Sequence, residues 1–204
     1  MKKLLMIGLM LSTLTTGHAQ HSIARVWNEE LLHAIRNDFA RPTVHARNLF
    51  HTSAAMYDAW AVFSAEASPY LLGKTMHGFE SSFAGFSYAP AEVDSLRKMA
   101  ITYAAYRLID HRFAASPGYA DIKPSLDSLL ELELGYDASL VDTDYTSGSA
   151  AALGNYIAAQ YIAYGLQDGA NEVNDYANQF YRPANQFLNT ESPGNPNITH
   201  PNRW

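Results

Sequence analysis

Residues 45–60 read His-Ala-Arg-Asn-Leu-Phe-His-Thr-Ser-Ala-Ala-Met-Tyr-Asp-Ala-Trp, a stretch whose apolar residues recur at helical spacing. Among its polar residues, four have side chains that are costly to bury without a partner: Arg47, Asn48, His51 and Asp58. A helix this apolar is expected to be buried, and burying a polar group without a hydrogen-bond partner costs about 2 to 7 kcal/mol. We therefore predict that these four side chains form a structural polar network with neighbouring helices.

A catalytic or metal-binding role for the same residues is the less favoured interpretation. His51 and Asp58 share a helix face but lie about 10 Å apart along the axis, too far to bind one metal ion together. The other histidines lack the zinc-binding spacing His-Glu-x-x-His. From the residues alone, no catalytic, cofactor-binding or metal-binding residue is expected.

Helical periodicity continues outward from this stretch, and the alternation typical of strands is almost absent. The sequence thus predicts an all-α fold, a bundle of about five helices followed by a long irregular segment. Helix ends are marked by Arg41-Pro42, because proline cannot donate the helical hydrogen bond, and by Gly135. The phenylalanines of the loop 68–89 are expected to pack onto the bundle. The expected helices span residues 22–39, 43–67, 90–115, 120–134 and 145–166.

Three segments are expected along the chain. Residues 1–19 combine Lys2 and Lys3 with an apolar run and a small-x-small site before Gln20, the order of a signal peptide. Residues 20–167 form the helical bundle. Residues 168–204 are rich in Asn, Pro and Gly yet hold five large aromatics, so they are expected to lie across a surface as an extended segment.

Composition narrows the function classes. The chain has 204 residues with 14 basic and 20 acidic side chains, a net charge of −6, which gives no basic surface for nucleic acid. No apolar stretch reaches the length of about 20 residues that a membrane-spanning helix needs, so no membrane span is expected in the mature protein. The absence of cysteine excludes disulfides and Cys-bound metals. We expect an exported protein, periplasmic or secreted.

Several phrases of the sequence resemble one family. Residues 25–28 and 45–60 are similar to the N-terminal helical region of the vanadium-dependent haloperoxidases, relatives of the type 2 phosphatidic acid phosphatases. Three later phrases resemble the stretch that leads toward the family's catalytic half, namely residues 168–171, 181–185 and 201–204. The resemblance implies that vanadate is the cofactor of the full-length family protein, held by several charge-assisted donors and an apical histidine.

The family's vanadate-binding motifs do not occur in this chain. In Lys-x6-Arg-Pro, the Arg-Pro pairs at 41–42 and 182–183 would need a lysine where Ala34 and Asp175 stand. Pro-Ser-Gly-His is also missing, since residues 192–195 read Ser-Pro-Gly-Asn. No catalytic residue is therefore carried over, and no cofactor is expected to be bound by this chain alone.

Two function classes stay open at this point. The first is the non-catalytic N-terminal part of an exported haloperoxidase-like protein, or of an acid phosphatase of the same superfamily, whose missing C-terminal catalytic half is its partner. The second is a standalone exported helical interaction module. Because the chain stops inside a family-like phrase at Arg203-Trp204, we expect it to be a fragment.

Overall fold

The structure is a computed structural model that describes residues 21–186, 194–195 and 198–203. The chain divides into two units, the first ending at Tyr164 and the second beginning at Gly165. The expected signal peptide, residues 1–19, lies outside the described residues. Within the described part of the second unit, the regular structure is one 3-10 turn, Glu172–Asn174.

The first unit confirms the prediction of an all-α bundle. The described residues contain five α-helices, and each lies within or close to a predicted span. Ser22 caps the first of them, its side chain accepting a hydrogen bond from the Arg25 backbone N–H. The helices are α2 (Ile23–Arg36), α3 (Pro42–Ala61), α4 (Val93–Phe113), α5 (Tyr119–Asp127) and α6 (Ala150–Gly165).

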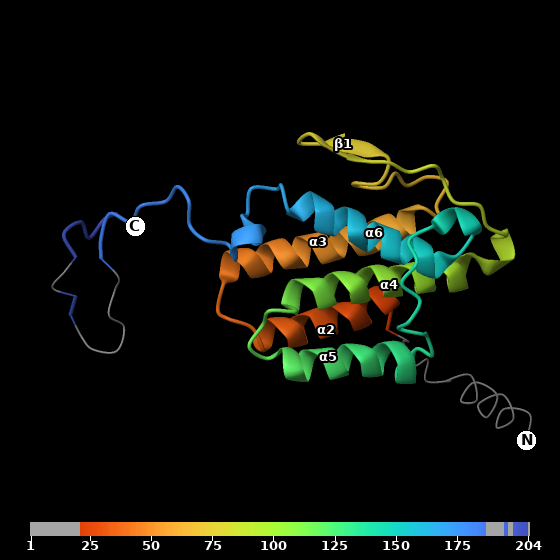
Figure 1. The fold of residues 1–204 in the computed structure, drawn as a ribbon, viewed down its shortest axis with the longest axis horizontal. Coiled ribbons are helices and arrows are strands. Elements are labelled where there is room, and N and C mark those ends of the chain that lie inside the picture. Colours follow the sequence, from red (N-terminus) through yellow and green to blue (C-terminus); the bar gives the residue numbers. More distant parts are fainter. Residues whose placement is uncertain (1–20, 187–193, 196–197, 204) are drawn as a thin grey trace, which may run out of the picture. The chain divides into compact units, whose positions relative to one another are not determined.

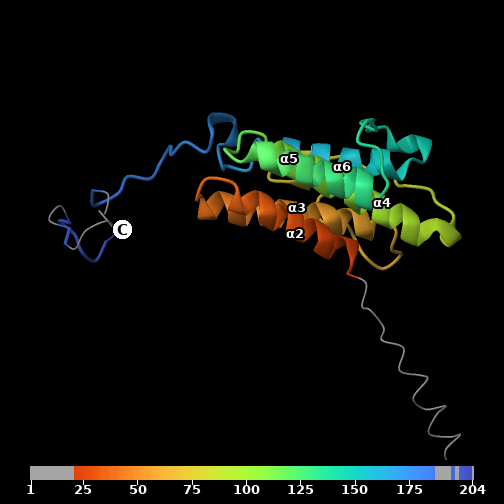
Figure 2. The ribbon, with the colours of Figure 1, turned by 90° about the horizontal axis from the view of Figure 1, so that it is seen from below.

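Helix α4 is the centre of the unit. The two views in Figures 1 and 2 together place it in the middle, with α2, α3, α5 and α6 around it. The crossing with α6 is close because Gly154 has no side chain: a Cβ there would lie 2.5 Å from the Ala100 carbonyl oxygen and 2.7 Å from Tyr103 Cβ. Aliphatic and aromatic side chains from all five helices fill the core around α4.

The end of α3 differs from the prediction. The helix stops at Ala61 and not at residue 67. Ser64 explains the early stop, since its Oγ accepts hydrogen bonds from the backbone N–H groups of Glu66 and Ala67, an alternative to the helical pattern.

The loop 68–89 contains a short hairpin where the sequence predicted only irregular chain. Strands β1 (Lys74–Met76) and β2 (Phe79–Ser81) pair antiparallel. His77 and Gly78 form the two-residue turn, both with positive φ, as hairpin turns require. Three-residue strands are too short for their alternation to be read from the sequence. The packing of Phe79, Phe83 and Phe86 against the core is as expected.

The last two predicted helices are each subdivided in the structure. Helix α5 continues as a π-helical turn, Ser128–Glu133, and the chain leaves it at Gly135, whose φ is +71°. Before α6, a 3-10 turn at Tyr145–Ser147 replaces the predicted first helical turn. Helix α6 begins after Ser149, whose Oγ caps it by accepting the Ala152 N–H at 3.2 Å.

Candidate functional site

Asp58 lies on the inner face of α3 and is completely buried. Its carboxylate accepts four hydrogen bonds: three from the consecutive backbone N–H groups of Tyr70, Leu71 and Leu72, and one at 3.1 Å from the Tyr161 hydroxyl of α6. Burial raises the pKa of Asp58, while the four donors act in the opposite direction. The carboxylate thereby holds the chain that follows α3 against both α3 and α6.

His51 lies at the middle of α3, about two turns before Asp58, and is also buried. Its Nδ1 is 3.3 Å from an Nη2 of Arg112 on α4, which also donates to the Tyr161 carbonyl oxygen at 3.2 Å. Since arginine can only donate, Nδ1 is the acceptor and the ring proton of a neutral His51 is on Nε2. The ring packs beside those of Tyr161 and Tyr164.

Tyr161 connects the hydrogen bonds of Asp58 with those of His51. Its hydroxyl group donates to Asp58 and its backbone carbonyl accepts from Arg112, so the chain of contacts runs from Asp58 through Tyr161 and Arg112 to His51. Burial, followed by the nearby charge of Asp58, raises the pKa of the Tyr161 hydroxyl far above its usual value. The hydroxyl therefore stays a proton donor across the physiological pH range.

Asn48 and Arg47 differ from these residues. Asn48 is buried, yet neither atom of its side-chain amide has a hydrogen-bond partner among the described residues. Arg47 is half-buried. Desolvation lowers the pKa of the nearby His111, and the positive charges of Arg112 and then Arg47 lower it further. The structure thus joins His51 and Asp58 through Tyr161 and Arg112, and does not draw Asn48 into the same chain of hydrogen bonds.

Sequence reasoning missed Arg112 and Tyr161. Both stand in segments that were predicted to be helical. Arg112 and Tyr161 are 49 positions apart, and Tyr161 and Asp58 are 103 positions apart, so spacing within one helix could not identify them as partners. A usable signal existed for Arg112, because it follows Leu108 by four and Ile109 by three positions and so lies on the apolar face of its helix. Such a position demands an acceptor inside the bundle.

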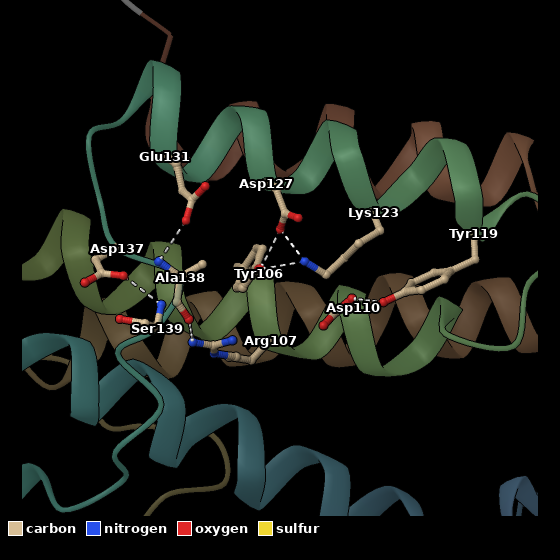
Figure 3. A network of polar contacts seen from close by, with 10 residues as sticks. All are labelled: Tyr106, Arg107, Asp110, Tyr119, Lys123, Asp127, Glu131, Asp137, Ala138 and Ser139. Carbon is tan, nitrogen blue, oxygen red and sulfur yellow. Dashed lines mark hydrogen bonds and ion pairs between the residues drawn. The ribbon is translucent and has the colours of Figure 1, made fainter.

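A second polar network joins α4 to α5 on the other side of the bundle (Figure 3). Tyr106 donates to Asp127 Oδ1 at 2.7 Å, and Lys123 binds both Asp127 and the Tyr106 hydroxyl, at 3.1 Å from the latter. Burial alone would lower the pKa of Lys123, but its bonds to Asp127 and Tyr106 raise it. Burial alone would raise the pKa of Asp127, but its bonds to Lys123 and Tyr106 lower it. The neighbouring Tyr119 donates to Asp110 at 2.7 Å, and its pKa rises to about 12, through burial and then the carboxylate.

Arg107 extends this network toward α6 (Figure 3). Its guanidinium donates to the carbonyl oxygens of Ala138 and Leu140, at 2.6 and 3.1 Å, and to Asn155 Oδ1 at 3.1 Å. Asn155 in turn donates to the carbonyls of Leu140 and Asp142. These bonds fix the long loop between α5 and α6, so this set of polar residues also has a structural function.

Two surface cavities of the first unit are lined by residues outside these networks. One of about 440 Å³ lies beside the hairpin, lined mainly by residues 73–75, residues 80–84 and Tyr145. Another of about 390 Å³ lies between the start of α2, Lys98 and Leu134. Each lining holds a single lysine, whereas binding a vanadate or phosphoryl group takes several convergent cationic donors.

The described residues contain no group of three or more His, Cys, Asp or Glu side chains placed to hold a metal ion. None of the helices in this part of the chain is long and apolar enough to cross a membrane. Comparisons with protein-family models, with curated proteins and with solved structures each return no match. The residues and their geometry are therefore the basis from which a function is inferred.

Proposed function

We propose that this chain is the non-catalytic, N-terminal helical part of an exported vanadium-dependent haloperoxidase-like protein. The parent protein would use vanadate to oxidise halide with peroxide. Its vanadate-binding residues would come from a catalytic half that these 204 residues do not contain, since neither Lys-x6-Arg-Pro nor Pro-Ser-Gly-His occurs in them.

One observation carries the proposal. The family-like phrase 45–60 forms most of α3, and its polar members Asn48, His51 and Asp58 are buried inside the bundle. The phrase thus corresponds to a helix whose polar side chains face the interior of the bundle. A helical scaffold of this kind supports a catalytic part by fixing the elements on which that part is built.

The same resemblance supports a second parent activity, that of an acid phosphatase of the same superfamily. Vanadate and phosphate are both tetrahedral oxyanions, and one set of cationic donors binds either. A different class, a standalone exported interaction module, is favoured by the exposed aromatic side chains along α3.

The test extends the chain along its reading frame. We expect the continuation to encode both missing motifs, and the extended protein to oxidise bromide with peroxide only when vanadate is added. The 204-residue chain should be inactive under the same conditions, and vanadate should raise the unfolding temperature of the extended protein alone, because a ligand stabilises only a protein that binds it.

Three results separate the alternatives. Hydrolysis of phosphoesters that vanadate inhibits would establish the phosphatase parent. A stop codon directly after codon 204 would refute the proposal of a missing catalytic half in the same chain and leave the standalone interaction module as the remaining function. Vanadate-dependent halide oxidation by the 204-residue chain itself would refute the proposal that its catalytic residues lie elsewhere.

A further inference from the structure

The most exposed positions of α3 carry no charge, and its one arginine, Arg47, is half-buried. Most surface helices direct charged residues to solvent and apolar residues inward, and α3 does the reverse with Asp58. The exposed positions of α3 are uncharged without exception: Pro42, Thr43, Ala46, Leu49, Phe50, Ser53, Tyr57 and Trp60.

Five of these positions form one straight row. Ala46, Phe50, Ser53, Tyr57 and Trp60 follow one another at intervals of four, three, four and three residues. This is the spacing of the seam along which two helices pack side by side in a coiled coil. The row, which we call the α3 seam, extends about 21 Å along the helix axis.

The large side chains of the α3 seam are already positioned. The Phe50 ring contacts Tyr70, which is also exposed, at 5.5 Å between ring centroids. Tyr57 and Trp60 lie 6.0 Å apart, the Tyr57 hydroxyl donates to the Ser68 carbonyl oxygen, and the Arg97 guanidinium covers one side of Trp60. Docking onto rings that are held in place loses little side-chain entropy.

The apolar area is what a dimer of standard size needs. The large side chains on this surface, those of the α3 seam and of the neighbouring Leu49 and Tyr70, are between 36% and 50% exposed. Side chains of this size present about 150 to 250 Å² each, so these five together offer about 400 Å². A stable interface buries about 800 Å² per partner, a little over half of it apolar. The five residues counted are Leu49, Phe50, Tyr57, Trp60 and Tyr70.

We propose that the α3 seam is the contact surface of a homodimer, in which α3 packs antiparallel against α3 of a second copy about a two-fold axis at Ser53. In that register the small Ala46 lies opposite the large Trp60 of the other copy, and Phe50 lies beside Tyr57. Ser53, small and uncharged, meets its own equivalent where the helices come closest. The small Ala46 therefore leaves room for Trp60 at each end of the seam, and the small Ser53 allows close approach at its centre, so that Phe50 and Tyr57 can pack between them as knobs into holes.

Charge favours a second copy over an unrelated partner. The chain carries a net charge of −6, so two copies repel each other except where neither presents a charge. The five positions of the α3 seam are uncharged, with Arg97 bordering the seam at Trp60, and a two-fold contact needs a surface that is complementary to itself. This inference is independent of the proposed function, since it concerns only the surface of the helical unit.

The test uses the purified chain in sedimentation equilibrium over a range of concentrations. We expect a dimer, with twice the chain mass of 22.6 kDa. Ser53→Glu and Ser53→Lys should each weaken dimerisation by about 100-fold or more, because like charges would meet at the two-fold axis. An equimolar mixture of the two variants should restore the dimer, because opposite charges then meet there.

A matched pair of alanine-to-glutamate substitutions provides the control. Ala46→Glu introduces a charge opposite Trp60 and should also give monomers, whereas Ala120→Glu, at an exposed position of α5, should leave the dimer unchanged. Circular dichroism should show equal helix content for all of them. A wild-type chain that stays monomeric at the highest concentration, or a Ser53→Glu variant that dimerises like wild type, would overturn the proposal. So would a mixture of the Ser53 variants that remains monomeric.

Discussion

Replacing Asp58 by alanine should lower the free energy of unfolding by about 3 to 5 kcal/mol, the range measured when one partner of a buried charged network is removed. The structure accounts for this magnitude. Leu71 and Leu72 are buried, so their N–H groups, like the Tyr161 hydroxyl, would lose an acceptor that water cannot readily replace. Each such donor left unpaired costs about 1 to 3 kcal/mol. Tyr70 is more exposed, and its N–H can turn to solvent. Relief from burying the carboxylate offsets part of the sum.

The measurement is equilibrium unfolding in urea, with Asp94→Ala as the matched control. Asp94 is fully exposed, and its contact with Arg97 is a long one of 3.9 Å, so its loss should change stability by about 0.5 kcal/mol or less. Equal slopes for the two variants would show that the comparison is of stability and not of compactness. Equal midpoints would refute the reasoning, because they would mean that the four hydrogen bonds of Asp58 contribute no more than a surface charge does.

Three further predictions concern other parts of the bundle. Asp127→Asn should destabilise the protein at pH 7 but not well below pH 3.8. The folded-state pKa of Asp127 is lowered, so the stability that Asp127 contributes through Lys123 is lost as the pH falls through that pKa. Urea titrations at both pH values test this. For His111 the folded-state pKa is lowered, so wild-type stability should fall as the pH drops below 6.5, and His111→Gln should reduce this fall in a pH series of thermal unfolding. Gly154→Ala should lower the unfolding temperature more than Gly85→Ala, since the first forces a methyl group into α4 and the second meets open space and bears only the strain of a positive φ. Equal effects of the two glycine changes would contradict the close crossing of α4 and α6.

The helices of this protein could be predicted because the signals that define them are local. Three signals act within a few residues: Ser22 precedes an apolar-periodic run, Pro42 separates the first two helices, and Gly135 follows the last turn of a helix. The structure places Pro42 in the first turn of α3. The errors arose where a side chain overrode periodicity. Ser64 ends α3 by binding the N–H groups that would have continued the helix, and this competition leaves no mark in the pattern of apolar residues.

The polar residues of α3 show where local reasoning ends. That Asp58 and His51 need partners followed from the sequence, because both stand in an apolar helix. The partners themselves did not follow: Asp58 takes backbone N–H groups that any residue could offer, and His51 meets an arginine 61 positions away. Asn48, grouped with them by sequence, has no hydrogen bond to connect it among the described residues.

Both proposals depend on helix α3, which buries several polar side chains among apolar ones and exposes aromatic rings. Its inner side holds Asp58 and His51, which fix its position relative to α4 and α6 through Tyr161 and Arg112. That rigid attachment allows its outer side to present aromatic rings without collapsing onto the bundle. A helix that exposed the same rings but was held only by apolar contacts could rotate to bury them, since apolar packing is not directional. The buried hydrogen bonds therefore explain the exposed seam: they determine which side of α3 faces outward, and Ser53→Glu probes that side without touching the bonds that set it.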